Sequence, residues 1–185
     1  MFFQKAALWF VRITQWCLAV ALLGISGHLV NEYAKAHSRV PPAVWLPCIT
    51  SAFAICIMFY SILLLYCLGR LLLHIAAFFD FCFMVTYIAA VVLNRHNFHS
   101  DGTQNETWLS LTYTRAAAGI DNHADRNLPL VKALAGLTTT LMVLFILTTL
   151  MCISLAWEAD ERHEEKTGHR RRSSSGVRRA RSSRV

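Results

Sequence analysis

Residues 71–93, LLLHIAAFFDFCFMVTYIAAVVL, form a long apolar stretch with an acid near its middle. A helix of about 20 apolar residues can cross the hydrocarbon core of a bilayer, so this stretch predicts a transmembrane span. An ionised carboxylate at the centre of a span costs roughly 2.5–3.5 kcal/mol on insertion scales. We therefore expect Asp80 to face other helices or water, and we expect the rest of the chain to supply those helices.

The chain of 185 residues collects its apolar residues into four long runs and leaves most charges between them. A soluble domain spreads its apolar residues in amphipathic patterns instead. The pattern predicts an all-α membrane protein: a four-transmembrane-helix bundle over residues 1–157, followed by a tail over 158–185. The expected spans cover about residues 7–30, 43–68, 71–93 and 129–157.

A cleaved signal peptide is the competing interpretation of the first run, because Lys5 and Arg12 give the chain a basic start. The apolar run extends beyond the 7–15 residues that are typical of a signal-peptide core. A retained span is therefore favoured.

Four of the polar residues within the predicted spans are candidate site residues: Arg12, Gln15, His74 and Asp80. Arg12 and Gln15 lie one turn apart on the first span, where we expect Arg12 to snorkel to the interface and Gln15 to find a deeper partner. His74 and Asp80 point in directions ~120° apart on one helix, so they do not share a face. A structural role for Asp80, as a hydrogen-bonding link between helices, is favoured over proton or cation handling. The partners expected at similar depth are Gln15, Tyr60, Ser61, Thr148 and Thr149.

The largest loop between spans, residues 94–127, is polar but contains an apolar patch at 108–113. That patch indicates either a short helix on the membrane interface or ordinary loop packing. The tripeptide Asn105-Glu106-Thr107 is an N-glycosylation sequon and predicts a modified Asn105 outside the cell.

Four spans put both termini on one side of the membrane, and the basic residues indicate which side that is. Twelve Lys and Arg residues lie on the terminal side against six on the other side or just inside the fourth span. The positive-inside rule therefore predicts cytoplasmic termini and a multi-pass protein, which we place in the plasma membrane.

The tail changes from an acidic segment, 158–165, to a basic and serine-rich one, 166–185, that holds eight Lys and Arg and no acid. Such a segment cannot form a core, so we expect it to be disordered. It predicts binding to anionic lipids of the inner leaflet rather than to nucleic acid. The expected lipid-binding residues are Arg170, Arg171, Arg172, Arg178, Arg179, Arg181 and Arg184. The expected phosphorylation sites, which would release the tail, are Ser173, Ser174, Ser175 and Ser182.

The sequence contains no metal-ligand spacing, no phosphate-binding glycine loop and no nucleophile elbow, so we expect neither an enzyme nor a cofactor. All six cysteines lie inside or at the edge of an apolar run. Most are interpreted as small buried hydrophobes. Cys67, beside Gly69-Arg70 at a membrane edge, is a candidate for S-acylation.

The first span carries the residues Arg12-x-x-Gln15 and then Leu23-Gly24-Ile25-Ser26-Gly27. Together with Asp80 and the four-span layout, these residues resemble the MARVEL-like membrane proteins, especially the fungal ones. The resemblance covers about residues 5–157. The outer loops lack the cysteines of the junctional relatives, which argues against a cell–cell junction role.

The resemblance implies a non-enzymatic scaffold that organises plasma-membrane domains. Its expected partners are the lipid bilayer and lateral contacts with copies of itself or with other membrane proteins. The alternative is a small proton- or cation-coupled transporter, channel or accessory subunit that uses Asp80 and His74.

Overall fold

The computed structural model describes residues 2–64, 70–97, 105–120, 127–154 and 157. Within these residues the fold is all helical, with no strand. The labelled elements are α1 (Phe2–Lys35), α2 (Pro42–Leu64), α3 (Arg70–Leu93), the 3₁₀ turn η2 (Arg95–Asn97) and α4 (Glu106–Ala117). A further long helix, Asn127–Ser154, follows and is called the fourth long helix below.

Four of these helices are long and apolar enough to cross a membrane: Ala6–Lys35, Pro42–Tyr60, Ile75–Leu93 and Asn127–Ser154. A helix satisfies all of its interior backbone groups within itself, which a segment surrounded by hydrocarbon requires. The prediction of an all-α bundle with four spans is confirmed at this level, and the chain has the organisation of a multi-pass membrane protein.

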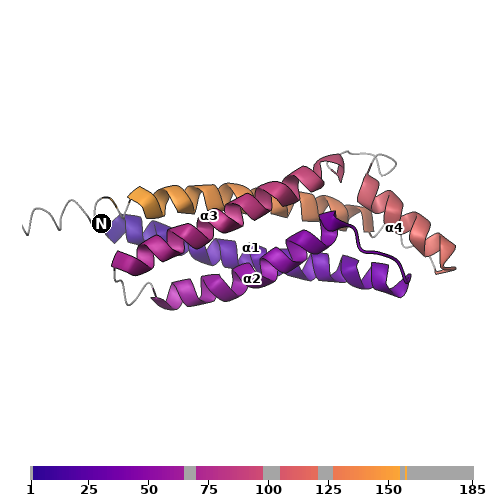
Figure 1. The fold of residues 1–185 in the computed structure, drawn as a ribbon, viewed down its shortest axis with the longest axis horizontal. Coiled ribbons are helices and arrows are strands. Elements are labelled where there is room, and N and C mark those ends of the chain that lie inside the picture. Colours follow the sequence, from indigo (N-terminus) through magenta and orange to yellow (C-terminus); the bar gives the residue numbers. More distant parts are fainter. Residues whose placement is uncertain (1, 65–69, 98–104, 121–126, 155–156, 158–185) are drawn as a thin grey trace, which may run out of the picture.

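The four long helices lie lengthwise against one another (Figure 1). The start of α1 and the last turns of the fourth long helix lie at one end of the bundle, which we call the terminal end. The link between α1 and α2, η2 and α4 lie at the opposite end, which we call the loop end.

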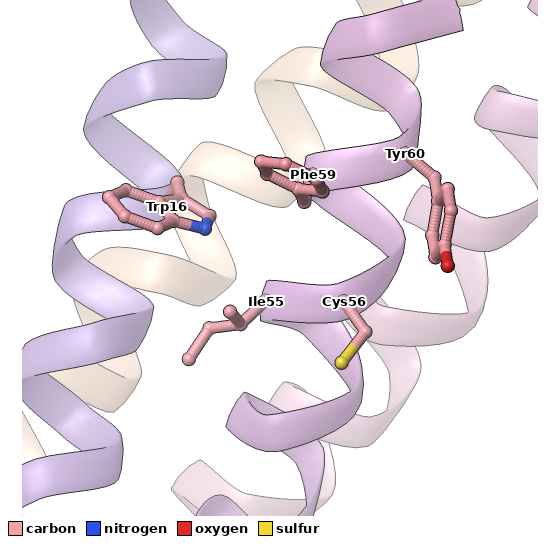
Figure 2. A pocket seen from close by; sticks show the side chains of 5 residues that line it. All are labelled: Trp16, Ile55, Cys56, Phe59 and Tyr60. Carbon is pink, nitrogen blue, oxygen red and sulfur yellow. The ribbon is translucent and has the colours of Figure 1, made fainter.

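The outside of the bundle is apolar, as a surface in contact with lipid should be. Large side chains with more than half of their area exposed include Phe53 on α2, Phe78 on α3 and Leu150 on the fourth long helix. Between α1 and α2 this surface is hollowed beside Trp16 and Phe59 (Figure 2).

Of the five described cysteines, Cys17, Cys56 and Cys82 are exposed on this apolar surface and one, Cys152, is buried, so the interpretation of most cysteines as buried was wrong.

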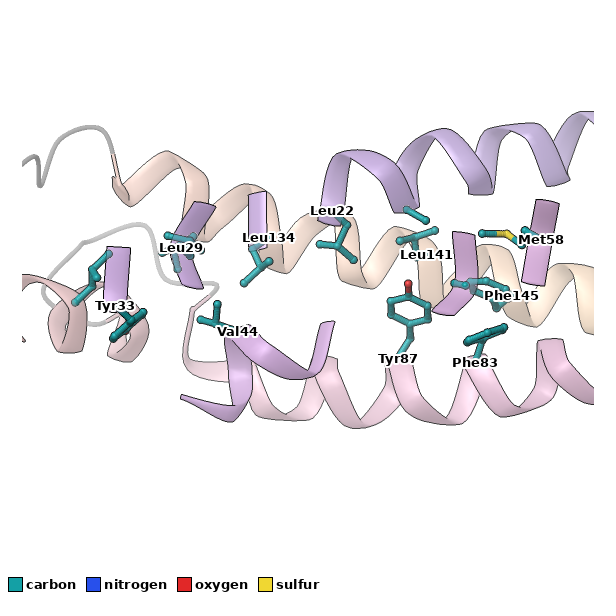
Figure 3. Close-up of a cluster of buried hydrophobic side chains, with 14 residues drawn as sticks. Leu22, Leu29, Tyr33, Val44, Met58, Phe83, Tyr87, Leu134, Leu141 and Phe145 are labelled. Atoms are coloured by element: carbon teal, nitrogen blue, oxygen red, sulfur yellow. The ribbon is translucent and has the colours of Figure 1, made fainter. Parts of the chain in front are cut away.

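The core is a continuous apolar cluster to which all four long helices and α4 contribute (Figure 3). Its centre is aromatic: the ring of Phe145 stacks on Tyr87 at 5.4 Å between centroids and lies 5.5 Å from Phe83. Toward the loop end, Leu29, Val44 and Leu134 bring three different helices together.

Helix α1 is longer than the sequence indicated. It continues past residue 30, the end of the first expected span, and ends at Lys35. Two features support the extra turn. Lys35 Nζ pairs with Glu32 at 2.8 Å, and the side chain of Tyr33 is fully buried. The polar residues at the end of α1 therefore belong to the helix, where they make contacts at the loop end.

Helix α2 begins at Pro42, so Pro47 lies in its second turn. A proline there cannot donate a hydrogen bond to the carbonyl of Ala43, four residues earlier. Asn94, at the end of α3, supplies the missing donor: its Nδ2 lies 3.0 Å from that carbonyl oxygen. The same amide also donates to Ala90 at 2.9 Å.

Candidate functional site

The charge in the middle of α3 is paired with a charge on α1. Both carboxylate oxygens of Asp80 accept hydrogen bonds from Arg12, Oδ1 from Nη1 and Oδ2 from Nη2, each at 2.6 Å. Both side chains are 3% exposed. This bidentate geometry matches the planar fork of the guanidinium to the plane of the carboxylate.

A third helix completes the site. The thiol of Cys152, on the fourth long helix, donates to Asp80 Oδ2 at 3.9 Å and accepts from Arg12 Nη2 at 4.0 Å. Beside it, Leu8 of α1 is buried in a small apolar cluster with Cys152. The ion pair is therefore closed off by groups from three helices.

One turn further along α1, Gln15 makes the same helix-to-helix connection without charge. Its Nε2 donates to Thr148 Oγ1 at 3.1 Å. The Thr148 hydroxyl donates to the carbonyl of Leu144 in its own helix. We call Arg12, Gln15, Asp80, Thr148 and Cys152 the intramembrane polar cluster.

The position of Arg12 corrects one expectation. It does not snorkel to the interface but is 2% exposed and faces the bundle interior. Pairing offsets the cost of burying each charge, so Asp80 holds the guanidinium inside. The partners of Asp80 were missed for this reason: its carboxylate is bound by Arg12 and Cys152, and Thr148, one of the expected partners, is bound by Gln15 instead. In the structure Arg12 and Asp80 both lie ten positions after the first residue of their helices, whereas the expected spans, 7–30 and 71–93, placed Arg12 nearer to a membrane edge than Asp80.

The interior direction expected for Asp80 and the deep partner expected for Gln15 both agree with the described contacts. His74 lies on α3 in a stretch for which only the backbone is described. No contact between His74 and Asp80 is therefore assigned.

A second polar network closes the loop end, and the sequence did not reveal it. Asn97 of η2 donates from Nδ2 to Asn94 Oδ1 at 2.9 Å and to Thr107 Oγ1 at 2.7 Å, and it accepts from the backbone of Thr107 at 3.1 Å. The Tyr33 hydroxyl donates to the Thr107 carbonyl at 3.0 Å. These contacts fix the start of α4 between α1 and η2.

A second buried ion pair fixes the other end of α4. Arg115 pairs with Glu32 of α1, and both are largely buried. Leu111, between the two polar contacts, enters the apolar core. The apolar patch in this loop is thus a helix packed on the bundle, with Tyr113 as its exposed aromatic residue. We call Glu32, Tyr33, Asn97, Thr107 and Arg115 the loop-end network.

Burial bears on the predicted glycosylation site. Asn105 is fully buried at the start of α4, and Thr107 of the same sequon is 3% exposed and engaged by Asn97. An enzyme could reach this amide only while α4 is away from the bundle. No contact tests the predicted modification directly, and the burial of Asn105 argues against it in the folded chain.

Several predicted sites lie outside the described residues: Cys67, the basic tail residues and the four candidate phosphorylation sites. Among the residues that the structure describes, no group of three or more His, Cys, Asp and Glu side chains gathers as a metal site would need.

Comparison with family models, with curated proteins and with solved structures gave no match.

Proposed function

We propose that this protein is a non-enzymatic membrane scaffold of MARVEL-like type, which organises domains of the plasma membrane through lateral contacts. The observation that carries the proposal is the pairing of Asp80. Both oxygens of this carboxylate are bound by the cationic guanidinium of Arg12. A carboxylate that takes part in transport must bind a proton or cation and release it again. The carboxylate of Asp80 is instead occupied by the positive charge of Arg12.

The proposed orientation places the terminal end of the bundle in the cytoplasm. It rests on the excess of basic residues on that side. In this arrangement the basic tail reaches the inner leaflet, where it binds anionic lipids. The loop-end network then gives the opposite surface a fixed shape.

A flux measurement tests the scaffold against a transporter or channel. Wild-type protein and the Asp80→Asn variant are reconstituted in liposomes that contain a pH-sensitive dye, with empty liposomes as the control. We expect proton flux at the level of empty liposomes for both proteins, together with clustering of the wild type in supported bilayers. A flux that appears with wild type and disappears with Asp80→Asn would overturn the proposal.

A further inference from the structure

A hollow of about 250 Å³ opens on the outside of the bundle between α1 and α2. It is lined by Trp16 from α1 and by Ile55, Cys56, Phe59 and Tyr60 from α2 (Figure 2). Trp16 and Phe59 face each other across the gap between the helices. We call this feature the α1–α2 hollow.

The hollow lies within the apolar part of the helices. Trp16 is ~15 Å along the helix axis from Ala6, where the first candidate span begins. Helix α2 continues beyond Tyr60 to Leu64. The hollow therefore opens toward hydrocarbon and not toward water.

Two polar groups line this otherwise apolar surface. The indole nitrogen of Trp16 points toward α2, and the Tyr60 ring runs back along α2 toward the level of Cys56 (Figure 2). Neither side chain makes a hydrogen bond to another described residue. Acyl chains offer no acceptor to an N–H or O–H group, so both donors remain unsatisfied when lipid alone covers the hollow. The Tyr60 hydroxyl in particular calls for an occupant that brings a hydrogen-bond acceptor to its depth.

We propose that the occupant is a second copy of this chain, docked α2 against α2 about a two-fold axis along the membrane normal. Such an axis places each residue at the same depth as its copy, so it brings the two Tyr60 hydroxyls to one level. A hydroxyl both donates and accepts, so one Tyr60 hydroxyl can donate a hydrogen bond to the other. Phe59, more than half exposed, then fills the hollow of the partner.

The middle of this α2 face permits a close approach. Ala52 and Cys56 are exposed, small and one turn apart, and small residues at a membrane helix interface let the two backbones come near. The inference rests on the proposed scaffold function and names the surface through which two copies would meet.

Cys56 supplies a natural reporter for the test. A full-length variant keeps Cys56 and replaces the cysteines at 17, 48, 67, 82 and 152 by alanine. A matched variant keeps only Cys82, which is exposed on α3. Both are reconstituted in liposomes at high dilution and treated with a thiol cross-linker spanning ~8 Å, close to the usual distance between packed helices.

We expect the Cys56 variant to form covalent dimers at least ~tenfold faster than the Cys82 variant, because a held pair raises the local thiol concentration. Ala52→Trp in the Cys56 background should abolish this difference by forcing the helices apart. The matched change Ala89→Trp, at an exposed position of α3, should leave it intact. Tyr60→Phe should lower the dimer-to-monomer ratio about threefold, the value of one average interhelical hydrogen bond.

The outcomes distinguish a failure of the proposed docking surface from a failure of the proposed scaffold function. If only the Cys82 variant cross-links, or if Ala52→Trp has no effect, lateral assembly stands but uses another face. If Cys56 stays monomeric while a lipid-soluble maleimide labels it rapidly, lipid covers the hollow and the inference fails. If wild type is also monomeric and evenly spread in bilayers, the scaffold proposal fails with it.

Discussion

At the scale of single residues, the Arg12–Asp80 pair matters because each charge alone would be costly inside the bundle. The two side chains reach each other only when α1 and α3 are packed at the correct depth and rotation. Removing one partner leaves an uncompensated charge, whereas removing both leaves an apolar contact. The pair therefore specifies how α1 and α3 pack against each other as well as stabilising the bundle.

We expect Arg12→Leu and Asp80→Leu each to lower the free energy of unfolding in detergent by about 3–5 kcal/mol. The double variant should be much closer to wild type, since no buried charge remains. Thermal or denaturant unfolding gives the free energy of unfolding of the wild type, the two single variants and the double variant. Arg39→Leu, at an exposed arginine, is a control that should change this free energy little. Additive losses in the double variant would mean that the two groups do not act as a pair.

Sequence reasoning located the acid of this pair but not its partner. Asp80 stood out because it interrupts an apolar run, and its inward direction followed from the cost of exposing it to lipid. Arg12 was placed at the interface because a long side chain can usually reach water there. Whether an arginine turns outward or inward depends on the rotation of its helix, which a nearly uniform apolar run does not specify.

At the scale of helices, α2 and α3 are joined by a polar contact that compensates for a proline. Pro47 leaves the Ala43 carbonyl without its helical donor, and Asn94 provides one from the neighbouring helix. The carbonyl that Pro47 leaves without a donor in α2 thus helps to fix the position of the end of α3.

We expect Asn94→Ala to lower the free energy of unfolding by about 1–3 kcal/mol, because a buried carbonyl loses its donor. Pro47→Ala in that background should recover part of the loss, since residue 47 then has an N–H for the Ala43 carbonyl. Denaturant unfolding of the two single variants and the double variant measures this. Recovery should be absent if Asn94 acts only through its contacts with Asn97.

Docking of α4 and a glycan on Asn105 exclude each other, because Asn105 is fully buried in the packed structure. Expressed in a glycosylating cell, the wild type should show little endoglycosidase-sensitive mass. Glu32→Ala removes the partner of Arg115 and should raise the modified fraction by freeing α4. Asn105→Gln, which removes the sequon, is the control. A fully modified wild type with α4 protected from proteases would contradict this reading of the loop.

The packing of helix α4 could not be predicted from the sequence pattern. Its apolar patch fitted both an interfacial helix and loop packing. The choice between them depends on Asn97, Glu32 and Tyr33, three residues from other elements. Such contacts between distant segments leave no periodic signal in the sequence, unlike the four spans, whose length and apolar content identified them directly.

At the scale of the whole molecule, the bundle and the tail have different chemistry. The tail lies outside the described residues, and its predicted function rests on composition. Residues 166–185 hold eight basic residues, and each contributes about 1 kcal/mol near an anionic surface.

We expect a peptide of residues 158–185 to bind vesicles only when they contain anionic lipid, with an affinity that falls as salt increases. Phosphoserine at positions 173, 174, 175 and 182 adds about −1.5 to −2 charges each, which should weaken binding at least ~100-fold. Vesicle titration by fluorescence measures both peptides. Equal affinity of the two forms would leave the tail as an anchor without a switch.

The intramembrane polar cluster also has a consequence for how the chain is made. Arg12 precedes Asp80 by 68 residues and Cys152 by 140. At a synthesis rate of about 5–20 residues per second, the first helix waits roughly 3–14 s for its counter-charge. During this interval the arginine must stay in a wet or protein-lined environment, so the nascent first helix should linger at the insertion machinery. Its release into the bilayer is then timed by the arrival of the third.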